Sequence, residues 1–92
     1  MHVFEKLLLK RWLKELQQNV DGLRSMSKAY VEQGGFREVS ETLEKLKAGD
    51  VFPKDLLERG RQAELKFADA CAELAECYQQ LLDFVKKATG VS

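Results

Sequence analysis

One repeat in the C-terminal third of the chain restricts the possible folds more than any other feature. Small or apolar residues recur there at alternating steps of three and four, without a break over more than four heptads. Because an α-helix has about 3.6 residues per turn, this spacing places all of these side chains along one side of a helix. The residues are Leu56, Gly60, Ala63, Phe67, Ala70, Leu74, Cys77, Leu81, Phe84 and Ala88. We expect them to be the buried seam of one long helix over about residues 53–88, with Gly90 as its C-cap.

A second stripe with the same spacing predicts another long helix over about residues 3–33. It comprises Leu9, Trp12, Leu16, Leu23, Met26 and Tyr30, and it is widened by Leu13 and Val20. Asn19 takes the place between Leu16 and Leu23, where a buried amide would fix the pairing of helices. Asp21-Gly22 is a turn signal, but the stripe resumes in phase at Leu23, so we expect one continuous helix.

The pair Gly34-Gly35 ends this helix, because glycine is a poor helix former and readily adopts a left-handed C-cap. A shorter helix is then expected over about residues 36–48, with its apolar positions at Phe36, Val39, Leu43 and Leu46. The chain is therefore predicted to be all-α. We favour an antiparallel hairpin of two long helices with the short helix between them. The alternative is an up-down-up three-helix bundle.

Charge and composition limit the classes of function. Residues 1–92 contain fifteen basic and fifteen acidic side chains and one proline, which suits a single helical domain without the positive field of a nucleic-acid-binding protein. No apolar run approaches the roughly 20 residues that a membrane span needs. The N-terminus lacks the uncharged core of a secretory signal, so we expect a cytoplasmic location.

The residues that most often carry chemistry are sparse. Cys71 and Cys77 lie six apart, which on a helix separates them by about 9 Å along the axis, so they cannot form a disulfide with each other. We interpret Cys77 as part of the seam and Cys71 as its neighbour, both as small apolar fillers. The only histidine is His2, at an end expected to fray. We therefore predict no catalytic residue, no metal site and no cofactor.

The start of the first helix has a basic face formed by Lys6, Lys10 and Lys14, with Phe4 and Trp12 nearby. This composition resembles amphipathic helices that bind membrane surfaces. A solvated face is the simpler interpretation, and a membrane partner is the less favoured one. The later half of the third helix is acidic, which favours an antiparallel arrangement of the long helices.

The functional prediction follows from apolar surface that one chain cannot cover. A short helix cannot hide the stripes of two long ones, and large exposed apolar patches mark interfaces. We expect a homo-oligomerisation and protein-protein interaction module, either a small adaptor, a regulator or an assembly domain, that forms a homodimer or binds another helical protein. Its expected interface residues are Leu9, Trp12, Leu16, Leu74, Leu81 and Phe84.

The competing class is a small all-helical dimeric enzyme with the architecture of the helical chorismate mutases. Arg11, Arg24 and Lys28 lie on the first helix, but the surrounding pattern does not match the basic set that a dianionic substrate needs. Fold-level analogy does not by itself establish an activity. Basic residues packed around a pocket would favour the enzyme, whereas solvent-facing Arg24 and Lys28 would favour the module.

Overall fold

The computed structural model describes residues 2–47 and 53–92, which form three helices. These are α1 (Val3–Glu32), α2 (Gly35–Lys45) and α3 (Lys54–Thr89), and no strand occurs in the described residues. The all-helical prediction is confirmed, and both long helices begin and end within one residue of their expected bounds. The expected end of the second helix at residue 48 lies outside the described residues.

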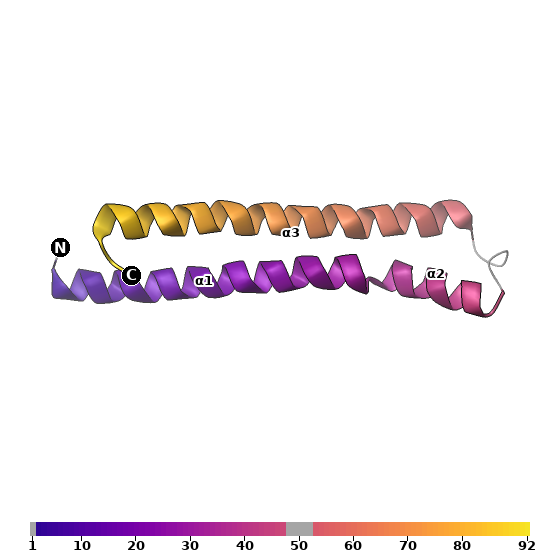
Figure 1. Cartoon of the computed structure of the whole chain (residues 1–92), viewed down its shortest axis with the longest axis horizontal. Helices are drawn as coiled ribbons and strands as arrows, with labels where there is room; N and C mark the ends of the chain where they lie inside the picture. The colour runs from indigo at the N-terminus through magenta and orange to yellow at the C-terminus, as the bar shows by residue number, and fades with distance from the viewer. Residues whose placement is uncertain (1, 48–52) are drawn as a thin grey trace.

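The molecule is a thin rod, with principal extents of 66 × 16 × 13 Å. Figure 1 shows α2 continuing the direction of α1 after a short interruption, while α3 runs beside both of them. Both chain termini therefore lie at the same end of the rod. The rod is only one pair of helices thick, so each helix packs along one side only.

The core lies between α1 and the C-terminal half of α3. Its buried members are Leu13, Leu16 and Val20 of α1, Ala75 and Leu82 of α3, and Val91 after α3. As expected, α1 passes through Asp21 and Gly22 without a break, and this keeps the three buried α1 residues on one side of a single helix.

The side of α3 that faces α1 differs from the prediction. Ala68, Cys71, Ala75 and Leu82 are buried, whereas the expected seam lies one position earlier along the chain. The physical reason is size, because small residues let the two helix backbones approach. Ser27 donates a hydrogen bond of 2.7 Å to the carbonyl of Ala68 across the same contact. The predicted seam on α3 is therefore wrong, because the adjacent stripe is the one that meets α1.

The interruption between α1 and α2 also differs from expectation. Gln33 is the C-cap of α1, and Gly34 is the N-cap of α2 with φ of −36°, so neither residue has a left-handed conformation. Gly34 is buried, and a Cβ atom there would collide with the carboxylate of Glu64. Glycine at this position therefore leaves room for the Glu64 carboxylate against the backbone. Gly90, in contrast, is left-handed with φ of 71° and caps α3 as predicted.

Two charged residues on α3, Arg61 and Glu64, hold this interruption. The Arg61 guanidinium donates hydrogen bonds of 2.7 and 2.6 Å to the carbonyls of Tyr30 and Val31 at the end of α1. The Glu64 carboxylate accepts a hydrogen bond of 2.7 Å from the backbone N–H of Phe36 at the start of α2. A cation thus sits at a helix C-terminus and an anion at a helix N-terminus, as the helix dipole favours.

Side chains cap the start of α1. His2 is its N-cap: Phe4 N–H donates to His2 Nδ1 at 3.2 Å, and His2 N–H donates to the Glu5 carboxylate at 3.3 Å. This reciprocal pair is a capping box, which satisfies two backbone donors that the first turn leaves free.

Candidate functional site

The stripe that was expected to be the buried seam of α3 is exposed. Phe67, Leu74 and Leu81 are 44%, 42% and 42% exposed. They are spaced by seven residues, which is close to two full helical turns, so they share one side of α3. An exposed row of large apolar side chains of this kind is unusual for a monomer and typical of an interface.

Exposed side chains of α1 extend this row. Trp12 and Met26 are 41% and 43% exposed. Asn19, Met26 and Leu74 line the same shallow hollow of about 380 Å³, which places them on one side of the helix pair. The rings of Tyr30 and Phe67 meet edge to face, with their centroids 5.0 Å apart. We name this surface the apolar face, formed by Trp12, Met26, Tyr30, Phe67, Leu74 and Leu81.

The structure separates the expected interface residues into two groups. Leu16 is buried in the core of the chain, and Leu9 is half-buried against that core. Trp12, Leu74 and Leu81 belong to the apolar face, and Phe84 is exposed three residues beyond Leu81. Met26, Tyr30 and Phe67 were present in the predicted stripes, but they were expected to be buried within the chain.

The burial of Asn19 and of the two cysteines also differs from the prediction. Asn19 was expected in a buried position, but it is exposed on the apolar face, midway between Trp12 and Met26 along the helix. Cys71 is buried and Cys77 is exposed, which reverses the expected order of seam and neighbour. Both corrections have the same cause, because the helices contact each other through the adjacent stripe.

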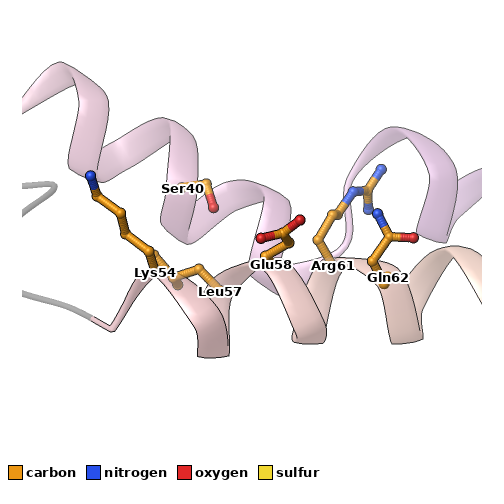
Figure 2. Close-up of a pocket in the computed structure, with 6 residues that line it drawn as sticks. All are labelled: Ser40, Lys54, Leu57, Glu58, Arg61 and Gln62. Atoms are coloured by element: carbon orange, nitrogen blue, oxygen red, sulfur yellow. The ribbon is translucent and has the colours of Figure 1, made fainter.

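A second hollow is lined mostly by polar residues. Where α2 meets α3, this hollow of about 370 Å³ is lined by Ser40, Lys54, Leu57, Glu58, Arg61 and Gln62. Figure 2 shows the stems of Lys54, Glu58 and Arg61 rising from α3 beside α2. Arg61 already donates hydrogen bonds to the carbonyls of α1, and the lining contains both basic and acidic side chains. This hollow therefore does not present a field of one sign to a charged substrate.

The charged residues of α1 that an enzyme would use face solvent. Arg11, Arg24 and Lys28 are exposed, and no polar or charged side chain is buried in the described part of the chain. Residues 2–47 and 53–92 contain no group of three His, Cys, Asp or Glu side chains placed to hold a metal ion. In the same residues, none of the helices has a stretch long and apolar enough to span a membrane.

Ion pairs contribute little to holding α1 against α3. Among the described residues, each ion pair lies within one helix: Arg11–Glu15 at 3.2 Å, Arg37–Glu41 at 3.0 Å and Arg61–Glu64 at 3.9 Å. The basic start of α1 and the acidic half of α3 thus form no direct bridge there. The pairing of these helices depends on apolar contact and on the hydrogen bonds around Gly34.

No protein-family model matches the chain, and comparison with curated proteins and with solved structures gives no match either.

Proposed function

We propose that this chain is a helical protein-protein interaction module that assembles with a second copy of itself. In this proposal each chain is a hairpin, and two hairpins place their apolar faces together to complete a four-helix bundle. Such a bundle would bury Trp12, Leu74 and Leu81 from both chains, and symmetric dimers commonly form in this way. The exposed apolar face is the observation on which the proposal depends.

The surface area of the chain supports assembly. The accessible surface is 7086 Å². A compact monomer of 10.5 kDa would expose only about 5,400 Å². The radius of gyration is 19.9 Å, whereas a compact chain of this length has about 12 Å. The excess surface is of the size that each partner of a stable dimer buries, roughly 800 Å² or more.

The composition of the apolar face also suits an interface. Trp12, Tyr30 and Phe67 are aromatic, and aromatic residues dominate the binding energy of interfaces when they are enclosed. Ala70 lies between Phe67 and Leu74, and Ala63 lies about one turn before Phe67; both are small and exposed and would let a partner helix approach. Of the interface residues expected from the sequence, Trp12, Leu74, Leu81 and Phe84 are free to contact a partner, while Leu9 and Leu16 support them from the core.

The solvent exposure of Arg24 and Lys28 favours this module over an enzyme of chorismate-mutase-like architecture. The free thiols of Cys71 and Cys77 suit a reducing compartment, so we place the module in the cytoplasm as part of the proposal.

The test is the mass of the protein in solution across a range of concentrations, by light scattering or sedimentation. We expect a dimer whose fraction rises with concentration. The double variant Leu74→Glu/Leu81→Glu should be monomeric, because four carboxylates would have to be buried in the dimer. Ala72→Glu, at an exposed position away from the apolar face, is the control and should keep the parent mass. A strictly monomeric parent, or a double variant with unchanged mass, would exclude this face as the interface.

A further inference from the structure

The end of the rod that carries both termini has an apolar tip separate from the apolar face. Val3, Phe4, Leu7 and Leu8 are 71%, 63%, 60% and 52% exposed, which makes them among the most exposed large apolar residues of the described chain. Phe4 and Leu7 lie on the side of α1 opposite Leu13 and Leu16, because their positions differ by about half a turn. Packing of two chains through the apolar face would leave these two side chains uncovered.

A basic collar surrounds this tip. Lys10, Arg11 and Lys14 follow the tip on α1, Lys6 lies within it beside Glu5, and Lys86 and Lys87 come from the last turn of α3. The Glu5 carboxylate accepts a hydrogen bond from the backbone N–H of His2. Lys10, Lys14 and Lys86 line one hollow of about 440 Å³ that has no acidic residue in its lining. Of the six cations, Arg11 alone forms an ion pair among the described residues, with Glu15.

The charge of the chain is polarised along the rod. Residues 2–15 and 83–92 contain six basic and three acidic side chains, whereas residues 16–82 contain nine basic and twelve acidic ones. Figure 1 shows that the first two ranges share one end of the rod. The neutral whole chain therefore has one positive end, and that end carries the apolar tip.

We propose that this end docks on the surface of a membrane that contains anionic lipid. Along the helix, Val3 to Leu8 spans about 8 Å, which matches the 5–10 Å to which interfacial helices bury their apolar residues. Lys10, Arg11 and Lys14 lie beyond that depth, where their long side chains can reach head-group phosphates. Lys6 lies within the tip, and its flexible side chain can extend to the same level while its stem remains in apolar surroundings. The occupant we propose is a membrane surface, because exposed apolar side chains beside a concentration of positive charge match acyl chains beside anionic head groups. The sequence alone favours a solvated face here, and the exposed tip is what changes that preference.

The experiment is co-sedimentation of the full chain with vesicles of phosphatidylcholine alone or with about 30% phosphatidylserine. We expect binding to the anionic vesicles, much weaker binding to the neutral ones, and release as salt is raised from about 0.1 M to about 0.5 M. Leu7→Glu should lower the partition coefficient about tenfold or more, because it replaces an inserted apolar side chain by a second carboxylate in addition to that of Glu5. Leu46→Glu is the matched control and should bind as the parent does. Leu46 is the C-cap residue of α2, at the far end of the rod, and it is 69% exposed.

Absence of binding to the anionic vesicles would overturn the proposal, and so would equal binding by Leu7→Glu and the parent. Equal binding to neutral vesicles would overturn the role of the basic collar. This proposal is independent of dimerisation. The mass of Leu7→Glu in solution should equal that of the parent, so a failure of membrane binding and a failure of assembly can be told apart.

Discussion

Two glycines in the interior of long helices have opposite roles at the residue scale. A Cβ atom at Gly22 of α1 would meet nothing within 4 Å. At Gly60 of α3, a Cβ atom would collide with the ring of Phe36, which rests on this glycine. Each glycine lowers the stability of its helix by a similar amount relative to alanine. Comparing the same substitution at the two positions therefore isolates the effect of close packing.

We therefore predict opposite effects of the same substitution. Gly22→Ala should raise the free energy of unfolding by about 0.5–1 kcal/mol through helix propensity alone. Gly60→Ala should lower it by about 1–2 kcal/mol, because the overpacked Phe36 ring outweighs that gain. Urea unfolding of both variants measures the difference. Equal stabilisation by the two substitutions would show that the packing of the Phe36 ring does not require glycine at position 60.

At the scale of the elements, the bend between α1 and α2 depends on one turn of α3. Arg61 and Glu64 are three residues apart, and they bind the end of one helix and the start of the next. Arg37 adds a hydrogen bond of 2.9 Å to the carbonyl of Val31. Because α2 is short and packs on α3 alone, these polar contacts contribute to its docking together with buried Leu43 and the Phe36 ring.

Removing either side chain should loosen α2. We predict that Arg61→Ala and Glu64→Ala each lower the free energy of unfolding by about 1–3 kcal/mol, the range for hydrogen bonds to charged groups. Glu64→Gln should lose less stability, because the side-chain carbonyl of glutamine can still accept the hydrogen bond from the backbone N–H of Phe36. Hydrogen exchange at the Phe36 amide should accelerate in Glu64→Ala. The neighbouring Gln62→Ala is the control, and an effect as large as that of Glu64→Ala would refute a specific role for the pair.

At the scale of the whole molecule, the rod has a narrow core relative to its length. Of the described residues, only Val20 and Leu82 are larger side chains that are fully buried. The other buried residues are Leu13, Leu16, Leu43, Ala68, Cys71, Ala75 and Val91. A core of this size stabilises a monomer only modestly, so a proposed partner would add much of the stability.

Thermal unfolding should therefore depend on concentration. We predict that the melting temperature of the parent rises by several degrees for each tenfold increase in protein, since association favours the folded state by mass action. Circular dichroism across a dilution series measures this. The variant Leu74→Glu/Leu81→Glu should melt at one lower temperature at every concentration. A parent whose melting temperature is constant would contradict coupled folding and assembly.

The sequence by itself determined the helices and most of their ends. The 3.6-residue period, the C-cap at Gly90 and the glycines near residue 34 are local signals, and local hydrogen bonding acts on them directly. It also determined that the chain carries more apolar helix surface than one pair of helices can cover.

Only the tertiary structure decided which stripe faces inward. Leu74 and Ala75 are neighbours, both are compatible with a helix, and a rotation of about 100° exchanges them. The choice depends on how closely α3 can approach α1, and small residues at Ala68, Cys71 and Ala75 allow the closer contact. The hydrogen bonds by which Arg61 and Glu64 cap other helices could likewise not be predicted from the sequence, because they join residues about thirty positions apart. Such contacts exist only once the helices lie side by side.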